Sequence, residues 1–177
     1  MQNVSGHADP LTPTNTWPET ARSRPAAPDD EWLLFRLFAE DRRAELERCG
    51  IPATAAEKLV ELQYRGQQQT YLQRYPGAEN LILFSESGKP AGRLLLDRQT
   101  DRWRIVDMAV FTEHRRGGIA TRAIRECQSS CRPSGARLEL QVNSANPARG
   151  LYERLGFRVV TATDVSLEMV WTAAPES

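Results

Sequence analysis

The sequence predicts a mixed α/β fold, built as one domain around a central sheet. Apolar residues recur at helical spacing between Asp29 and Tyr75, whereas from Leu81 onward they follow the two-residue period of strands. A later strand leads through a glycine-bearing turn straight into another helix, an order typical of sheets that carry helices on their faces. The chain of 177 residues is long enough for one substantial core and too short for two full-sized domains.

Composition excludes several classes of function. Lys and Arg together number 23, and so do Asp and Glu, so no overall charge draws the chain to nucleic acid or anionic lipid. Hydrophobic residues make up 40% and charged residues 26%, which are ordinary values for a globular protein. No apolar run is long enough to cross a bilayer, and the N-terminal residues lack the apolar core of a secretory signal. We therefore expect a cytoplasmic protein that binds neither nucleic acid nor membrane.

The cysteines predict free thiols and no metal site. Cys49, Cys127 and Cys131 are odd in number, and neither His7 nor His114 lies near them at a spacing typical of zinc ligands. Because Cys127 and Cys131 are four positions apart, they would share one face of a helix. Small core residues are a more common interpretation of such a pair than a redox or ligand role.

The first 18 residues are expected to form a flexible tail. Pro10, Pro13 and Pro18 stand there among Ser, Thr, Asn and Gly, a mixture that sustains neither a helix nor a buried core. The single domain is then expected over residues 19–173.

Helices and strands are expected in a mixed order, without an internal repeat. Two helices precede most of the sheet, and the second opens with a capping-box pattern of Thr54 and Glu57. The strand over residues 138–142 should run parallel to the strand over 103–111 if the helix between them is a right-handed crossover. Strands are expected near residues 20–24, 81–84, 93–96, 103–111, 138–142, 158–161 and 165–171, and helices near 29–48, 54–75, 119–127 and 147–155.

The segment over residues 108–121 carries the strongest functional signal. A strand feeds a turn that contains Gly117 and Gly118 and opens directly into a helix. Such a turn aims unpaired backbone N–H groups outward, and the helix dipole adds partial positive charge, so a phosphate group can bind there. Residues 101–137 also carry eight arginines against four acids, in a chain that is neutral as a whole. The pattern fits neither a Rossmann dinucleotide loop nor a Walker A loop.

The spacing of this turn resembles the R/Q-x-x-G-x-G/A signature of the GNAT superfamily of acyl-CoA-dependent N-acyltransferases. Arg115, Gly118 and Ala120 occupy the three defined positions. One departure is Arg116, which stands where the common form of the signature has Gly.

The resemblance extends beyond the turn, over about residues 20–171. Residues 105–110 look like the strand that precedes the turn in this superfamily. Asn146 together with residues 151–157, LYERLGF, is similar to its N…LYExxGF element. Two independent elements at the right separation make a chance match improbable.

The resemblance implies a GNAT-like fold, a mostly antiparallel central sheet with one parallel, splayed pair of strands, flanked by helices. The pantetheine arm of acetyl-CoA would lie between the splayed strands and its pyrophosphate at the turn, with no metal involved. A homodimer is also common in such families. The implied cofactor-binding residues are Met108, Ala109, Val110, Arg115, Arg116, Gly117, Gly118, Ile119, Ala120, Thr121, Asn146 and Tyr152.

Three residues are candidates for proton transfer. Tyr152 resembles the general acid of the superfamily, although an aromatic that merely packs the short helix is the alternative. Asp107 and Glu139 are candidate bases for the amine, with a surface ion pair or a solvated position as the alternatives. The superfamily often has a carboxylate at the position of Gln141, which cannot act as a base.

The second helix is the expected wall of the acceptor pocket. Tyr64, Gln68, Tyr71 and Tyr75 fall on one of its faces, which either lines a polar pocket or packs against the sheet. The predicted function is transfer of an acetyl group from acetyl-CoA to the primary amine of a small molecule, by direct attack in a ternary complex. The alternatives are the same chemistry on a protein or peptide amine, and a non-catalytic acyl-CoA-binding sensor.

Overall fold

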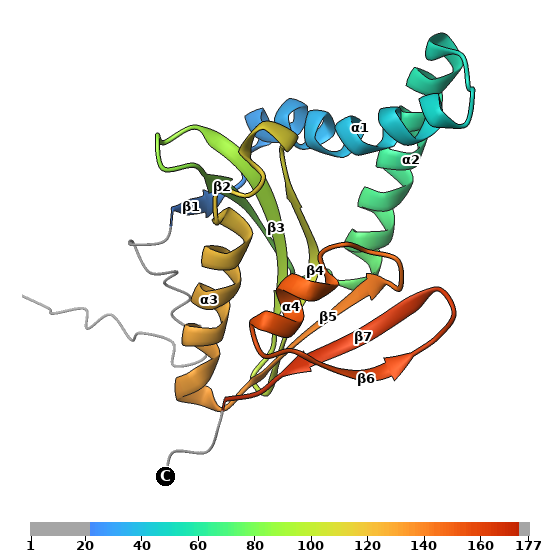
Figure 1. The fold of residues 1–177 in the computed structure, drawn as a ribbon. Helices are drawn as coiled ribbons and strands as arrows, with labels where there is room; N and C mark the ends of the chain where they lie inside the picture. Colours follow the sequence, from blue (N-terminus) through green and yellow to red (C-terminus); the bar gives the residue numbers. More distant parts are fainter. Residues whose placement is uncertain (1–21, 174–177) are drawn as a thin grey trace, which may run out of the picture.

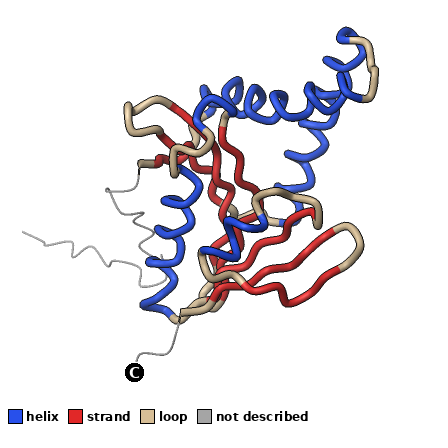
Figure 2. The backbone as a smooth tube through the Cα atoms, viewed as in Figure 1, coloured by secondary structure: helices blue, strands red, loops and turns tan. Residues whose placement is uncertain are grey.

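Seven strands join into one mixed sheet in the computed structural model, which describes residues 22–173. Across the sheet they lie in the order β1-β2-β3-β4-β5-β7-β6 (Figures 1 and 2). The strands are β1 (Ser23–Pro25), β2 (Glu79–Phe84), β3 (Pro90–Arg98), β4 (Arg102–Val110), β5 (Arg137–Asn143), β6 (Arg158–Ala162) and β7 (Ser166–Trp171). The tail expected at residues 1–18 lies outside the described part of the chain.

The parallel pair consists of β4 and β5, and every other neighbouring pair of the described strands is antiparallel. Pairing starts where Arg102 faces Arg137 and ends where Ile105 faces Leu140, although both strands continue beyond that point. The two strands then diverge, as Figure 1 shows. The predicted mixed sheet with one parallel pair is confirmed.

Helices cover both faces of the sheet. One face carries α1 (Glu31–Arg48) and α2 (Ala53–Arg74), and the other carries α3 (Ile119–Cys131) and α4 (Arg149–Arg154) (Figure 1). Short 3₁₀ turns at Pro28–Asp30, Thr112–His114 and Arg132–Ser134 are η1, η2 and η3. Within residues 22–173 no helix combines the length and apolar character that a membrane span needs, and the cytoplasmic location stays a prediction.

Two local expectations are wrong. The second helix begins one residue before Thr54, so this side chain is not at the N-cap position and forms no capping box; Glu57 instead accepts a hydrogen bond from Arg43 at 2.6 Å. Val165 precedes β7 and is exposed, so it does not share the buried side of that strand, because the turn from β6 still sets its backbone direction.

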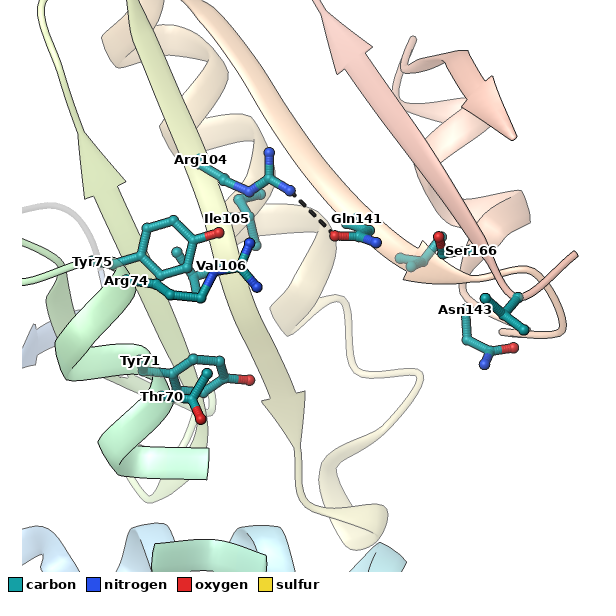
Figure 3. A pocket seen from close by; sticks show the side chains of 12 residues that line it. Thr70, Tyr71, Arg74, Tyr75, Arg104, Ile105, Val106, Gln141, Asn143 and Ser166 are labelled. Carbon is teal, nitrogen blue, oxygen red and sulfur yellow. Dashed lines mark hydrogen bonds between the residues drawn. The ribbon is translucent and has the colours of Figure 1, made fainter. Parts of the chain in front are cut away.

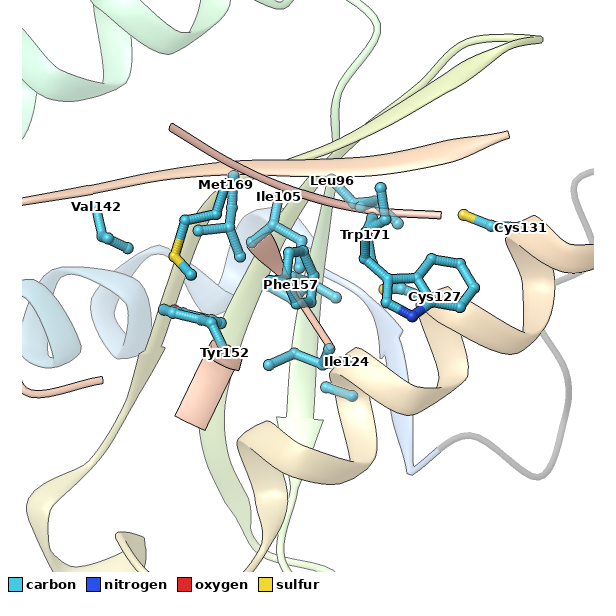
Figure 4. Packing of buried hydrophobic residues seen from close by; sticks show 14 of the residues in the cluster. Leu96, Ile105, Ile124, Cys127, Cys131, Val142, Tyr152, Phe157, Met169 and Trp171 are labelled. Atoms are coloured by element: carbon cyan, nitrogen blue, oxygen red, sulfur yellow. The ribbon is translucent and has the colours of Figure 1, made fainter. Parts of the chain in front are cut away.

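The main core lies between the sheet and the pair α3 and α4 (Figure 4). Ile124, Cys127 and Cys131 are completely buried there and lie on one face of α3, which confirms the expected core role of the two cysteines. From the sheet, Met169 and Trp171 pack into the same cluster. Each large side chain buried in this way contributes about 1.5–3 kcal/mol.

A β-bulge in β4 decides which side chains face the two layers. Asp107 and Ile105 pair with consecutive residues of β3, so Val106 between them has no partner on that strand. Ile105 and Met108 therefore both reach the core under α3, although in a regular strand they would point to opposite faces. Asp107 points to the other face, toward α1 and α2.

Candidate active site

The turn after β4 forms one wall of a cavity of about 420 Å³. Gly118 has a φ of 75° and immediately precedes α3, so the first N–H groups of that helix have no partner within it. Several arginines give the wall a positive charge, a combination that suits a diphosphate. The cavity is lined by the sequence-predicted residues Val110, Arg115, Arg116, Gly118, Ile119, Ala120 and Thr121, and also by His114, Leu151 and Arg154.

Arg116 is the only described residue other than glycine with a positive φ, at 64°. It stands where the family signature has Gly, a residue that adopts this conformation without a steric penalty. For an L-residue with a side chain the left-handed conformation costs roughly 1–2 kcal/mol. Arg116 therefore keeps the backbone shape that Gly gives the turn, but it adds backbone strain and a positively charged guanidinium.

Arg115 ties this turn to α1. Its Nε donates to the carbonyl of Val110 at 3.0 Å, and its Nη2 bonds both oxygens of Asp41 at 2.7 and 2.8 Å. Nearby, Glu40 of α1 accepts from the backbone N–H of Thr112 at 3.2 Å. The carbonyl of Val110 at the end of β4 is thus already hydrogen-bonded. The backbone N–H and C=O groups earlier in the strand are the ones left to bind an extended ligand.

Tyr152 lies on α4 and is buried beside Val142, Met169 and Phe157 (Figure 4). Its ring meets the ring of Phe157 edge to face, with centroids 5.9 Å apart. Burial raises the pKa of Tyr152 to about 12, and the negative charge of Asp107 adds to this shift. The phenol therefore keeps its proton at neutral pH.

Asp107 belongs to a partly buried polar network under α2. The guanidinium of Arg93, which is 3% exposed, reaches Asp107 Oδ2 at 3.3 Å, Asn80 Oδ1 at 2.8 Å and Gln68 Oε1 at 3.3 Å. Burial raises the pKa of Asp107, and the charge of Arg93 and the amide of Met108 offset only part of that effect. A carboxylate in this state accepts a proton more readily than one in water.

A second cavity, of about 340 Å³, opens in front of this carboxylate between β4, α1 and α2. Met108, Ala109 and Asn146, all predicted from the sequence, line it together with Asp107. Asn146 also holds the turn before α4, because its Oδ1 accepts from the backbone N–H of Ala148 at 2.8 Å.

Glu139 is engaged by two arginines. Its carboxylate lies 3.4 Å from Arg104 and 2.6 Å from Arg137, and its side chain is 12% exposed. Arg104 also reaches Glu168 at 3.0 Å and the side-chain oxygen of Gln141 at 3.5 Å. Because both of its oxygens are paired, Glu139 is a weaker candidate base than Asp107.

A third cavity, of about 400 Å³, lies at the gap between β4 and β5 (Figure 3). From α2, Tyr71 and Tyr75 line it, whereas Tyr64 of the same predicted face packs between Phe35 and Phe38, with centroid distances of 5.4 and 5.5 Å. Burial raises the pKa of Tyr71 to about 12, again with a contribution from the carboxylate charge on β4. The helix face thus serves packing at one end and the cavity at the other.

Among the charged residues that line these cavities, Arg93 and Arg154 were not predicted from the sequence. The sequence does not show that Arg93 is buried, because β3 is buried at nearly every position and its residues follow no alternating pattern. Arg154 follows Tyr152 on α4 by two positions and could have been suspected from the motif itself.

Comparison with known proteins agrees with this geometry. Residues 51–172 match the sequence profile of the Acetyltransferase (GNAT) domain. Among solved structures, PaiA N-acetyltransferase from Thermoplasma acidophilum, in complex with coenzyme A, is 15% identical over 85% of this chain and 98% of its own, with a TM-score of 0.64. An acetyltransferase from Thermus thermophilus is 20% identical over 85% and 96%, with a TM-score of 0.60. No curated protein sequence matches significantly.

The chain therefore belongs to the GNAT acetyltransferase family, because the profile covers more than half of it. At these identities the solved structures establish the fold, which is the predicted one. Acetyl-CoA is the acyl donor of the family.

Proposed function

We propose that the protein is an N-acetyltransferase that transfers the acetyl group of acetyl-CoA to the primary amine of a small molecule. The observation that carries the proposal is the unpaired edge of β4, which leads from the cationic cavity at the turn to the cavity at Asp107. One strand can thus present a bound donor to a bound acceptor.

The donor would be held by backbone more than by side chains. The turn and the start of α3 suit the diphosphate, with Arg116 and Arg154 supplying charge. The backbone of Met108 and its neighbours, on the edge that β5 has left, suits the amide groups of the pantetheine arm. An N–H of the same stretch would polarise the thioester carbonyl, a contribution of about 3 kcal/mol in comparable sites.

Asp107 is the base that we propose for the amine. Proton removal is needed because a free alkyl amine has a pKa of roughly 10.4. The raised pKa of the Asp107 carboxyl brings it closer to the pH at which the base must act, which suits a general base. Arg93 fixes the orientation of the carboxylate. The amine nitrogen then attacks the thioester carbon, the C–S bond breaks, and the thiolate takes up a proton.

Tyr152 is the donor that we propose for this proton. With a pKa of about 12 the phenol stays protonated at neutral pH, so it can donate when the thiolate forms. Its short helix packs on the core, which limits its movement.

A small acceptor is favoured by the size of the two cavities on this side of the sheet. They have volumes of about 340 and 400 Å³, within the range of small-molecule sites. Tyr71 and Tyr75 of α2 close one wall of the larger cavity.

The test is release of coenzyme A from acetyl-CoA with a panel of primary amines, using Tyr152→Phe and Asp107→Asn. We expect Tyr152→Phe to lower kcat at least tenfold and to leave the coenzyme A affinity within threefold. Tyr64→Phe is the matched control, because this tyrosine packs between α1 and α2, and its turnover should be unchanged.

Asp107→Asn should remove the acidic limb of the pH–rate profile, since the rate of the unmodified protein falls as pH drops through the raised pKa of this carboxyl. Equal turnover of Tyr152→Phe and the unmodified chain would exclude the phenol from the mechanism. Tight binding of acetyl-CoA without release for any amine would favour a sensor instead.

A further inference from the structure

We infer that the acceptor carries a carboxylate and that Arg74 binds it, so that the enzyme acetylates amino carboxylates whose amine and carboxylate are separated by a few methylene groups. This inference rests on the proposed function and adds the chemical class of its substrate. It starts from a charge at the cavity between β4 and β5 that has no partner among the described carboxylates.

Two arginines line this cavity, Arg74 from α2 and Arg104 from β4 (Figure 3). Arg104 is neutralised within the fold, because Glu139 and Glu168 lie at 3.4 and 3.0 Å from it. Arg137 in turn pairs with Glu139 at 2.6 Å. These two arginines and two glutamates leave no net charge.

Arg74 is different. Its guanidinium lies over the ring of Tyr75, 5.7 Å from the centroid, and among the described residues no carboxylate pairs with it. On the same side of the sheet, the charge of Asp107 is matched by that of Arg93. The acceptor side thus has one positive charge in excess, and a guanidinium binds a carboxylate through two parallel hydrogen bonds.

The position of Arg74 also sets the length of the acceptor. Gln67 lines the cavity at Asp107 and Arg74 lines the next one, seven residues further along α2. At 1.5 Å per helical residue the Cα atoms of these two residues are about 10 Å apart along the helix axis. Because the two cavities are separated along α2, an acceptor that reaches both needs a spacer of a few methylene groups between its amine and its carboxylate.

The test compares three amines of equal length that differ only at the far end, 4-aminobutanoate, butylamine and 1,4-diaminobutane. We expect kcat/KM for 4-aminobutanoate to exceed that of the other two at least tenfold. Arg74→Gln should abolish this preference by raising KM for 4-aminobutanoate about tenfold, with kcat unchanged. Arg74→Lys should restore part of it.

Arg65→Gln is the matched control, since Arg65 is also an exposed arginine on α2 but pairs with Glu61 and does not line this cavity. It should behave like the unmodified protein. A preference for butylamine or 1,4-diaminobutane would overturn the inference, and so would an equal loss for all three amines in Arg74→Gln. In both cases release of coenzyme A would still support the proposed function.

A binding measurement separates the two proposals if none of the three amines is acetylated. Calorimetric titration of 4-aminobutanoate into the protein with coenzyme A present should give a binding signal that Arg74→Gln loses and Arg65→Gln keeps. Such a result would support the carboxylate site on its own. Absence of binding to the unmodified protein would overturn it.

Discussion

Gly92 on β3 is the described glycine with the least room for an added methyl group. A Cβ built there would lie 2.4 Å from the carbonyl oxygen of Ala109 and 3.2 Å from the Cα of Val110. Carbon and oxygen atoms that are not bonded do not approach within about 3 Å, so β4 would have to move by roughly 0.6 Å. The movement falls on the strand whose other edge faces the gap between β4 and β5.

We therefore expect Gly92→Ala to destabilise the protein by about 1–3 kcal/mol, the usual cost of overpacking. For a protein of this size that corresponds to a fall in Tm of roughly 2–12 °C. The affinity for coenzyme A should fall as well, because Ala109 and Val110 lie next to the proposed donor site.

Urea denaturation and calorimetric titration with coenzyme A measure the two effects. Gly66→Ala is the control, because Gly66 lies within α2 with nothing within 4 Å of an added Cβ. That change should stabilise the helix by up to about 1 kcal/mol. A Gly92→Ala protein as stable as the unmodified one, with the same affinity for coenzyme A, would refute the close approach of β3 and β4.

Two further predictions concern charge and strain. Arg24 donates to both oxygens of Asp30 at 2.5 and 2.8 Å, and these bonds with the Ala27 amide lower the pKa of the Asp30 carboxyl to about 2. Because the pKa of Asp30 is depressed in the folded state, its contribution to stability is fully present when the pH is above the ordinary pKa of an aspartate. This contribution is lost as the pH falls toward 2. Asp30→Asn should thus lower the free energy of unfolding by about 1–2 kcal/mol at pH 7, given the partial exposure of Arg24. In urea denaturation, the difference in this free energy from the unmodified protein should shrink between about pH 4 and pH 2. A constant difference would contradict this origin. Arg116→Gly should relieve the strain of the left-handed backbone and stabilise the protein by up to about 1 kcal/mol. The same change should weaken coenzyme A binding several-fold. A loss of stability would show that the backbone at this position is not strained.

The sequence predicted the turn at residues 115–121 because its shape depends on local features. Glycines, a following helix and a cluster of arginines are neighbours in the chain, so no knowledge of the rest of the fold is needed. The parallel pairing of β4 and β5 was equally accessible, since a strand, a helix and a strand in succession have few ways to pack.

The bulge at Val106 could not be predicted in this way. Whether a residue is left without a partner depends on the register between two strands, which only the packed sheet determines. The same is true of Arg93, whose strand is buried on both faces and shows no alternation. The sequence predicted one role for the whole tyrosine-bearing face of α2. In the structure Tyr64 packs against α1, whereas Tyr71 lines a cavity, because α2 extends past α1, which covers only its first half.

The bulged strand β4 contributes side chains to both faces of the sheet. Ile105 and Met108 support the face on which α3 lies, and Asp107 between them belongs to the opposite face. Substitutions on α2 at the proposed acceptor cavities therefore leave the residues around the proposed donor cavity unaltered. Without Val106 the alternation would be regular, and Ile105 and Met108 would still share one face while Asp107 faced the other.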